Sequence, residues 1–277
     1  MGEQVRVRQY QIGEFARKMG VTPDYLKHYE SHGLISVLPR ERGYRYFGFE
    51  QSPRILQCMS LRNYGVMVDE MGEILDGCDA PAASERLEEH VEALRRRIVR
   101  DTAMVEEHEF MKAWLARRRR QPEDWEVTET EPLLYLAHSN GSDFLEDERI
   151  YSILEQWVDW MPVVKQTQEI TPDVGAGGLF PFTWGVMISE AKALRLGIPV
   201  NEAVVRIPAG KAFIYHFGGA LEPGEVSICP PPDHRVFALM KQHGLRPAGK
   251  IYRVVYMYAH MKNRMEQYGI FIVPLTL

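Results

Sequence analysis

The chain has 277 residues, of which 45% are hydrophobic, so it is long enough for two domains with packed cores and a connector. Residues 1–66 carry ten Lys or Arg against six Asp or Glu, and residues 67–277 carry 23 against 32, so the net charge is +4 in the first segment and −9 in the second. The basic segment, residues 1–66, is suited to binding nucleic-acid phosphates. The acidic segment, residues 67–277, is repelled by them. The sequence shows no signal peptide and no long apolar run, so we expect a cytoplasmic protein with no membrane partner.

Residues 12–30 predict two short helices joined by a sharp turn. Ala16 is small enough for the helices to cross closely, and Gly20 supplies the backbone freedom that the turn needs. Thr22 is expected to cap the second helix, and Pro23 suits its first position because the amide that proline lacks has no intrahelical partner there. The second helix is therefore expected to begin near Pro23.

Helical spacing divides the side chains of the second helix between an inner and an outer face. Val21, Leu26 and Tyr29 are expected to face inward, and the outer side carries Asp24, Tyr25, Lys27 and His28. Because a recognition helix offers its N-terminal residues to bases and phosphates, we expect DNA contacts from Thr22, Tyr25, Lys27 and His28. The alternative is an ordinary helical hairpin with a charged outer face.

Residues 40–47 predict a hairpin with Gly43 at its tip. Arg42, Tyr44 and Arg45 surround this tip and are expected to contact the DNA backbone as a wing. Two further helices are expected over residues 50–64 and 68–76, separated by Gly65. These elements together predict a winged helix-turn-helix.

Several ordered segments resemble the MerR family of bacterial transcription regulators over residues 10 to about 76. They are YQIGEFA at 10–16, GVT at 20–22, LKHYE at 26–30, HGLI at 32–35, GYRYF at 43–47, LRNYG at 61–65 and EIL at 73–75. The chain departs from the family at Lys27 and His28, where Arg and Tyr are usual, which alters the base or phosphate contacts. It also has Gly48 and Met67 where the family usually has Ser or Thr, so we expect weak or absent caps at both helix starts.

The three cysteines, Cys58, Cys78 and Cys229, lie far apart and form no paired motif. Metal-sensing members of the resembled family place one Cys at the end of the first domain and another in a loop after the long helix. Cys78 matches the first position, and nothing matches the second. We therefore expect no disulfide, no metal and no cofactor, with the cysteines acting as small buried or half-exposed thiols.

Residues 82–118 contain no Gly or Pro, which predicts one long helix. Leu87, Val91, Leu94 and Ile98 are spaced by four, three and four residues, so they form an apolar stripe. The MerR resemblance implies that this helix pairs antiparallel with its copy in a homodimer on a palindromic operator. The arginines at 95–97 and 117–120 are either further DNA contacts or, more simply, solvated charges suited to a helix C-terminus.

Residues 121–124 break the long helix, which gives three expected parts: 1–79, 80–120 and 121–277. The last part mixes strands and helices, so the fold class is α+β. We expect strands over 126–138, 181–189, 203–217, 250–258 and 267–274, with helices over 146–161 and 233–244. This order suggests a pseudo-repeat of strand, helix and two strands (βαββ).

The third part resembles the GyrI-like effector-binding domain of multidrug-responsive regulators, most clearly in HGLRPAG at 243–249, IYRVVY at 251–256 and EQYGIFIVPL at 266–275. That resemblance implies a groove that holds a small aromatic effector against aromatic walls. Tyr252, Val254, Tyr256 and Tyr258 are expected to share one strand face. The expected ligand contacts are Trp157, Trp184, Tyr215, Tyr252, Arg253, Tyr256 and Tyr268, although each aromatic alone also fits a core position.

Arg253 occupies the position where cation-binding relatives place an acidic residue. A buried carboxylate favours a lipophilic cation and a guanidinium does not, so we expect neutral or anionic aromatic effectors. Alternatively, the charge of a cation is met by Glu190 or Glu202, or Arg253 points to solvent because the strand register differs by one residue.

The combined resemblance implies a regulator that distorts an overlong promoter spacer when its effector binds, so that RNA polymerase can engage both promoter hexamers. Its implied partners are double-stranded promoter DNA, a second copy of the chain, RNA polymerase and the effector. The alternative is a small-molecule hydrolase using Glu146, Asp147 or Glu202 as a base, but no catalytic motif accompanies them and no catalytic residue is assigned. A further alternative is a DNA-architectural protein without a ligand.

Overall fold

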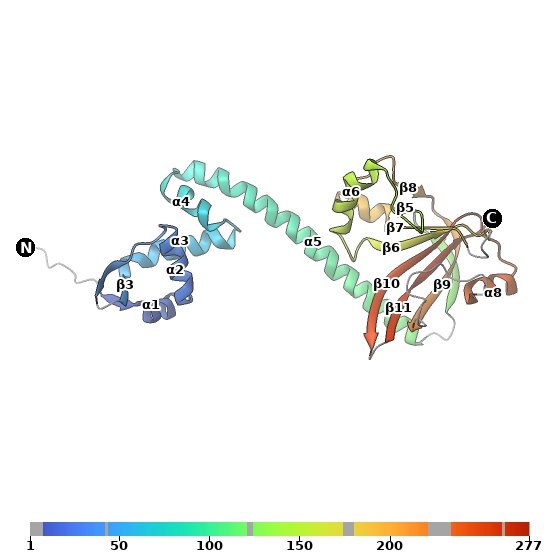
Figure 1. Cartoon of the computed structure of the whole chain (residues 1–277), viewed down its shortest axis with the longest axis horizontal. Helices are drawn as coiled ribbons and strands as arrows, with labels where there is room; N and C mark the ends of the chain where they lie inside the picture. The colour runs from blue at the N-terminus through green and yellow to red at the C-terminus, as the bar shows by residue number, and fades with distance from the viewer. Residues whose placement is uncertain are drawn as a thin grey trace, which may run out of the picture. The chain divides into compact units, whose positions relative to one another are not determined.

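The computed structural model describes residues 8–41, 44–120, 124–173, 180–220, 234–261 and 264–276. The chain divides into two compact units, residues 1–98 and 99–277, and the division falls within the long helix α5 (Ala80–Arg120). Figure 1 labels the elements of each unit. The predicted helix over residues 82–118 is confirmed, and α5 extends two residues further at each end.

The first unit has the predicted order of helix, turn, helix, hairpin and two helices. Its elements before α5 are β1 (Gln9–Gln11), α1 (Ile12–Met19), α2 (Pro23–Ser31), β2 (Leu38–Glu41), β3 (Tyr44–Gly48), the 3-10 turn η1 (Phe49–Gln51), α3 (Ser52–Asn63) and α4 (Val68–Asp76). The three strands form an antiparallel sheet in the order β1-β3-β2. The helix predicted over residues 50–64 is preceded by η1 and begins at Ser52.

Local sequence signals set the helix ends of this unit. Gly20 ends α1 in the left-handed conformation with φ 70°, which glycine adopts without steric cost. The hydroxyl of Thr22 caps α2 by accepting a hydrogen bond from the Tyr25 N–H at 3.2 Å. Gly48 and Met67 supply no side-chain cap to η1 and α4, as expected.

The core of the first unit lies under the helix-turn-helix. Leu26 and Tyr29 of α2 are buried there, and the ring of Phe15 stacks on that of Phe47 with centroids 5.3 Å apart. Ala16 is also buried, and a larger side chain at this position would push the two helices apart. The core thus holds α1, α2 and β3 together and leaves the outer side of α2 open to solvent.

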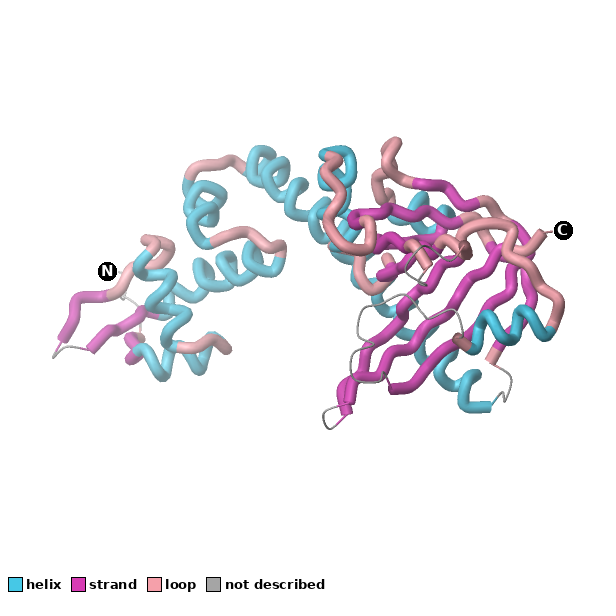
Figure 2. Tube along the Cα trace, turned by 45° about the vertical axis from the view of Figure 1, so that its right-hand side comes forward, coloured by secondary structure: helices cyan, strands magenta, loops and turns pink. Residues whose placement is uncertain are grey.

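The second unit is one eight-stranded sheet with helices. Its elements after α5 are β4 (Trp125–Thr130), β5 (Leu133–Ser139), α6 (Glu148–Val158), β6 (Lys165–Ile170), β7 (Phe182–Ser189), α7 (Glu190–Leu196), β8 (Val205–Ile207), β9 (Gly210–Ala220), α8 (Arg235–Gln242), β10 (Ile251–Met261) and β11 (Arg264–Pro274). The strand order is β4-β9-β11-β10-β6-β7-β5-β8, and Figure 2 shows the sheet as a continuous curved layer.

Two predicted strands are each split in the structure. The strand expected over residues 126–138 is interrupted at Glu131 and Pro132, so that β4 and β5 lie in different parts of the sheet. Proline lacks the N–H that a ladder requires, which accounts for the break. The strand expected over residues 203–217 is likewise divided into β8 and β9. The sequence interpretation also missed β6 and α7.

The predicted pseudo-repeat is present in the strand order. The run β5-α6-β6-β7 forms one half, and β9-α8-β10-β11 forms the other. In the sheet the halves read β9-β11-β10 and β6-β7-β5, so corresponding strands are related by an approximate two-fold axis between β10 and β6. These two strands pair antiparallel from Ile251 opposite Ile170 to Val255 opposite Gln166. The two halves therefore meet at the β6–β10 ladder.

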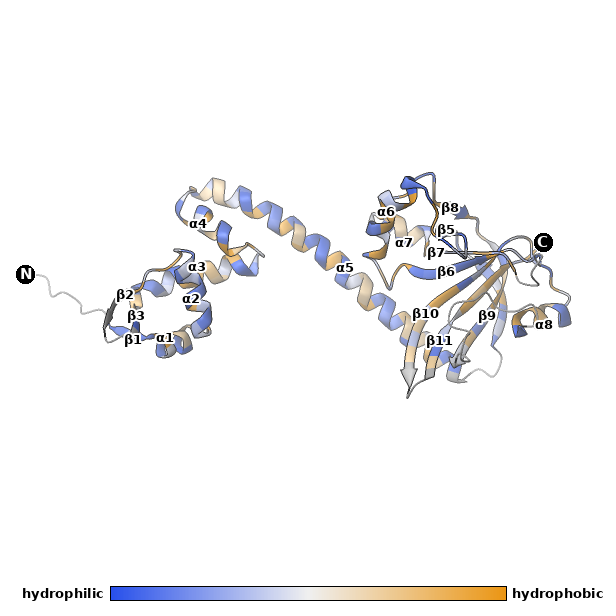
Figure 3. Ribbon diagram, viewed as in Figure 1, coloured by the Kyte–Doolittle hydropathy of each residue, from blue (hydrophilic) through white to orange (hydrophobic). Residues whose placement is uncertain are grey.

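The sheet has two differently covered faces. Helices α6 and α8 pack on the side that carries Leu136 and Phe271, which we call the helix face. Residues 107–114 of α5 contact the side that carries Lys165 and Tyr256, which we call the α5 face. Hydrophobic residues are prominent on the strands of the sheet, whereas α5 is more mixed along its length (Figure 3).

Candidate nucleic-acid interface and ligand pocket

The outer side of α2 carries the expected polar groups. Thr22, Lys27 and His28 are exposed, whereas Leu26 and Tyr29 are buried. The Nζ of Lys27 lies 2.7 Å from Oδ1 of Asp24, and this hydrogen bond lowers the pKa of the carboxyl group. Exposed ion pairs of this kind are weak, so a phosphate can replace the carboxylate as the partner of Lys27.

Tyr25 is held in place rather than free to move. Its hydroxyl lies 2.5 Å from that of Tyr29, and the guanidinium carbon of Arg62 lies 4.9 Å from its ring centroid. Arg62 belongs to α3 and is exposed, so the fold adds a cation beside the recognition helix. The sequence interpretation did not identify Arg62. The signal that could have indicated it is the position of Arg62 on the exposed side of the helix predicted after the wing.

The strand of the wing is tied to the end of α2 by an ion pair. The Nε of Arg45 lies 2.8 Å from Oε2 of Glu30, and both side chains are partly exposed. Tyr44 begins β3, but the described part of the chain does not include its side chain, and Arg42 lies outside it altogether. The geometry of α1, turn, α2 and the β2–β3 hairpin defines the class, a winged helix-turn-helix domain.

The comparison with protein families places this domain. The model described as "MerR HTH family regulatory protein" matches residues 10–78. These residues therefore form a MerR-type helix-turn-helix domain. The chain is also similar to the nodulation protein NolA of Bradyrhizobium diazoefficiens, with 32% identity over 100 residues, and to NolA of Bradyrhizobium elkanii, with 31% over 100 residues. Those matches cover 36% of this chain and 41% and 45% of the relatives, so the chain spans less than half the length of the curated relatives it matches.

Solved structures show weaker likeness. An EcmrR–DNA complex is 15% identical with a TM-score of 0.33, covering 96% of this chain and 99% of that one. HiNmlR, described as a MerR family regulator lacking the sensor domain and bound to promoter DNA, is 18% identical with a TM-score of 0.33, covering 41% and 94%. These TM-scores are too low to carry an argument about function.

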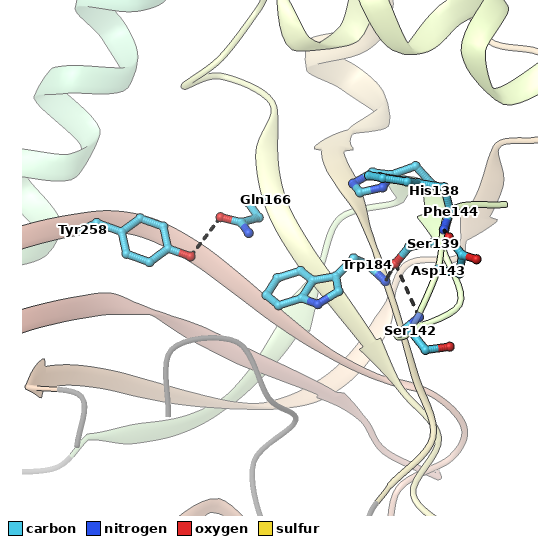
Figure 4. A pocket seen from close by; sticks show the side chains of 9 residues that line it. His138, Ser139, Ser142, Asp143, Phe144, Gln166, Trp184 and Tyr258 are labelled. Carbon is cyan, nitrogen blue, oxygen red and sulfur yellow. Dashed lines mark hydrogen bonds between the residues drawn. The ribbon is translucent and has the colours of Figure 1, made fainter. Parts of the chain in front are cut away.

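The second unit contains a cavity of about 430 Å³ on the helix face. It lies between the loop that follows β5 and the strands β6, β7 and β10, and Figure 4 shows the indole of Trp184 at its centre. Phe144 is 69% exposed and lies at its rim. The cavity is lined by His138, Ser139, Gly141, Ser142, Asp143, Phe144, Gln166, Trp184 and Tyr258.

Of the seven side chains predicted to contact a ligand, Trp184 lines this cavity and the other six do not. Trp157 is a fully buried residue of α6 and donates a hydrogen bond to the carbonyl of Pro199 at 2.8 Å. Tyr215 is buried near α8, where its ring lies 5.9 Å from that of His234. Both residues are therefore part of the packing of the sheet against its helices.

Three other predicted contacts lie on the α5 face. Tyr252 packs edge-on against Tyr135, and Tyr256 packs edge-on against Trp114 of α5. Tyr268 is on the same face, and its hydroxyl donates to Glu266 at 2.6 Å. The structure thus does not bring the seven predicted residues into one site.

The prediction that Tyr258 shares a face with Tyr252 and Tyr256 is wrong. The ladder between β10 and β11 shifts register between Val255 and Met257, which marks a β-bulge. The extra residue turns Tyr258 to the helix face, where its hydroxyl donates to Gln166 at 2.9 Å. Because of this bulge Tyr258, rather than Tyr256, lines the cavity.

Arg253 is buried beside the cavity, with 9% of its surface exposed. Its Nη1 donates to Oε1 of Gln168 at 3.0 Å, and its Nη2 donates to Oε1 of Gln267. The alternative in which Arg253 points to solvent is therefore wrong. Glu190 pairs with Arg206 at 2.6 Å and does not line the cavity.

On the α5 face a buried carboxylate joins α5 to the sheet. Glu107 is 3% exposed, and its oxygens lie 2.5 Å from Nζ of Lys165 and 2.9 Å from Nζ of Lys192. Burial lowers the pKa of Lys165, and the contact with Glu107 opposes that effect. Nearby, the indole N–H of Trp114 donates to Nδ1 of His216 at 3.1 Å. The last third of α5 is thus bound to the sheet by polar contacts as well as packing.

The side chains considered for hydrolysis occupy other places. Asp147 caps α6, and its two oxygens accept hydrogen bonds from Arg149 at 3.0 and 2.7 Å. Glu202 and Glu146 are both exposed, and neither is among the residues that line the cavity. Across the described ranges, no helix is both long and apolar enough to span a membrane.

Proposed function

We propose that this chain is a ligand-responsive transcription regulator that binds promoter DNA through residues 10–78. The MerR-type domain carries the proposal, because its recognition helix α2 presents Thr22, Lys27 and His28 on an open side. Arg62 and Arg45 flank that helix and are placed to contact phosphates. Lys27 and His28 are the groups nearest to the base edges in this arrangement.

The regulator acts as a homodimer on a palindromic operator. Ile98 and Val105 of α5 are both 64% exposed, and an isolated helix gains by covering such side chains. Pairing of α5 with its copy buries them and presents two DNA-binding domains to two half-sites. The arginines at 95–97 are exposed and suit the solvated side of such a pair.

The effector is a small aromatic molecule that stacks on Trp184 in the cavity of the second unit. A cavity of about 430 Å³ suits a drug-sized compound, and its mixed lining of Trp184, Phe144 and polar groups is typical of ligand pockets. The second unit then acts as a GyrI-like effector-binding domain. Arg253 beside the cavity favours neutral or anionic effectors over cations.

Binding of the effector changes the DNA through α5. Gln166 lines the cavity, and its neighbour Lys165 pairs with Glu107 of α5, so a ligand can favour one position of the helix. The linker residue Pro122, considered for the same role, lies outside the described residues. The bound dimer bends and untwists an overlong promoter spacer so that RNA polymerase engages both hexamers, which requires about 1–6 kcal/mol of deformation energy.

The test combines selection of operator DNA with transcription in vitro. Binding sites are selected from random duplexes with the full chain, and transcription from a promoter carrying that site is measured with and without neutral, anionic and cationic aromatic compounds. We expect a palindromic site and an increase in transcription with at least one compound that also raises the melting temperature. Failure to select any sequence from the random pool would refute the regulator assignment.

A further inference from the structure

The buried Arg253 fixes the direction of a chain of hydrogen bonds. A guanidinium group has five N–H donors and no acceptor, so it can only donate. It donates to Oε1 of Gln168 at 3.0 Å and to Oε1 of Gln267. The oxygens of both amides are therefore turned toward Arg253, and both NH₂ groups point away from it.

The chain of hydrogen bonds continues from Gln267 to the cavity. Nε2 of Gln267 donates to the hydroxyl of Tyr258 at 2.9 Å, and that hydroxyl donates to Oε1 of Gln166 at 2.9 Å. Gln166 lines the cavity beside Trp184, as Figure 4 shows. Because its oxygen is occupied by Tyr258, the group that Gln166 offers to a ligand is its NH₂.

A second amide donor lies next to Trp184. Gln168 is fully buried and stands directly opposite Trp184 in the ladder between β6 and β7. Its Oε1 accepts from Arg253, and its Nε2 has no hydrogen-bond partner within the part of the chain that the structure describes. A buried donor without an acceptor is costly, so an acceptor supplied by a ligand would be bound favourably.

Two other ionisable groups, His138 and Asp143, line the cavity. Burial lowers the pKa of His138, which favours the neutral ring, and its buried Nδ1 has no hydrogen-bond partner among the described residues. Asp143 is exposed at the rim, where its Oδ1 accepts a hydrogen bond from the N–H of Phe144 at 2.8 Å. The Gln166 side of the cavity therefore presents a donor, whereas the carboxylate of Asp143 is exposed.

We infer that the cavity selects aromatic effectors that carry a hydrogen-bond acceptor, a ring carbonyl or carboxylate, and rejects aromatic ammonium ions. The ring stacks on Trp184 while the acceptor receives the N–H of Gln166, which lines the cavity. The unpartnered amide of Gln168, opposite Trp184 in the ladder but not itself a lining residue, adds a second donor close by. Arg253 acts without touching the ligand, because it orients the amide groups and polarises the chain of hydrogen bonds that they form. This inference rests on the proposed function, since it names the chemistry of the effector at the same cavity.

The experiment compares three probes that share one ring: 2-acetonaphthone, 2-naphthoate and 2-naphthylmethylammonium. Dissociation constants for the full chain are measured by isothermal titration calorimetry. We expect the ketone and the carboxylate to bind at least about tenfold tighter than the ammonium ion, because only they accept the amide hydrogen bonds. Equal binding of all three would overturn the inference.

Variants separate the inference from the proposed function. Gln166→Glu keeps an acceptor for Tyr258 but replaces the NH₂ with a carboxylate oxygen, so it should reverse the preference toward the ammonium ion. Gln156→Glu is the matched control, because it makes the same substitution at an exposed position of α6 that does not line the cavity, and it should leave the preference unchanged. Trp184→Leu should weaken all three probes.

The outcomes are distinct. Probes that depend on Trp184 but show no acceptor preference would overturn the inference and leave the effector cavity standing. Probes indifferent to Trp184→Leu, or no binding of any probe, would overturn both. The side-chain amide resonance of Gln166 in the wild-type chain gives a check that needs no folded variant, because 2-acetonaphthone should shift it and the ammonium ion should not.

Discussion

Lys165 and Gln166 are consecutive on β6 but point to opposite faces of the sheet. Nζ of Lys165 lies 2.5 Å from Oε1 of Glu107 on α5, whereas Gln166 lines the cavity on the helix face. Successive side chains of a strand point to opposite faces of the sheet, which accounts for this arrangement. A single peptide unit thus connects a residue that lines the cavity to a residue that binds α5. We therefore expect that a ligand that moves Gln166 would also affect the ion pair that holds the helix.

Removing the buried carboxylate should destabilise the second unit. Glu107→Ala leaves Lys165 buried without its anion, and breaking a buried pair in this way typically costs about 3–5 kcal/mol. All five tryptophans lie beyond residue 98, so their fluorescence during denaturant unfolding reports on this unit. Glu106→Ala is the matched control, since Glu106 is exposed and pairs with Arg195, and its effect should be much smaller. Equal losses in both variants would contradict the role of burial.

The stability of the second unit should fall as the pH drops below about 6.5, the ordinary pKa of histidine. Burial, and then the nearby Arg118, lower the pKa of His216, and its Nδ1 accepts the N–H of Trp114. Below pH 6.5 the unfolded chain binds a proton that the folded chain does not, so the free energy of unfolding falls as the pH drops. The fall continues until the pH passes the lower pKa of the folded state, and below that pKa this group causes no further loss. Burial lowers the pKa of His138 in the same direction.

The measurement is the free energy of unfolding between pH 7.5 and about 5, a range above the ordinary pKa values of Asp and Glu. His216→Asn keeps an acceptor for Trp114 but cannot titrate, so it should reduce the slope. His243→Asn at an exposed position is the control and should leave the slope close to that of the wild type. An unchanged slope in His216→Asn would show that His216 is not the responsible group.

DNA binding should depend on Arg45 more than on its partner Glu30. Arg45→Ala removes a cation from the wing, so affinity should fall and the slope of log K against log salt should decrease by about one. Glu30→Gln removes the competing carboxylate, which lies 2.8 Å from Nε of Arg45, and should leave affinity equal or higher. Fluorescence anisotropy with a selected operator at several salt concentrations measures both. A loss of affinity in Glu30→Gln as large as that in Arg45→Ala would mean that the ion pair serves only the structure of the domain.

The sequence predicted the first unit well because its signals are local. Gly20, Thr22 and Pro23 each determine the conformation of their own residue or cap a helix within three residues, and the structure contains each feature. The strand β6 was missed because KQTQEI lacks apolar alternation. Lys165 of this strand binds Glu107, and Gln166 lines the cavity. The same polar residues that form the site therefore remove the apolar pattern by which the strand could have been predicted.

The composition of the cavity was harder to predict for a different reason. Trp184 was identified, but Tyr258 was assigned to the wrong face because the bulge after Val255 leaves no mark on the period-two pattern. Gln166 and Gln168 carry no motif of their own. They gain significance through Arg253, which lies 85 residues beyond Gln168 and stands opposite it in the β6–β10 ladder. Arg253 is connected to Gln166 through Gln267 and Tyr258.

Pairing of α5 with a second copy should depend on its exposed apolar side chains. Ile98 is 64% exposed, and a charge placed there should leave the monomer folded, because the side chain packs little within its own chain. It should weaken the dimer, because burying an unpaired ammonium group in a helix pair is unfavourable. Light scattering after size-exclusion chromatography is expected to show a lower mass for Ile98→Lys at micromolar concentration. Leu194→Lys is the matched control, since Leu194 is 85% exposed on α7 and away from the proposed stripe, and it should remain dimeric. A dimer that survives Ile98→Lys but is lost in Leu194→Lys would move the interface from α5 to the second unit.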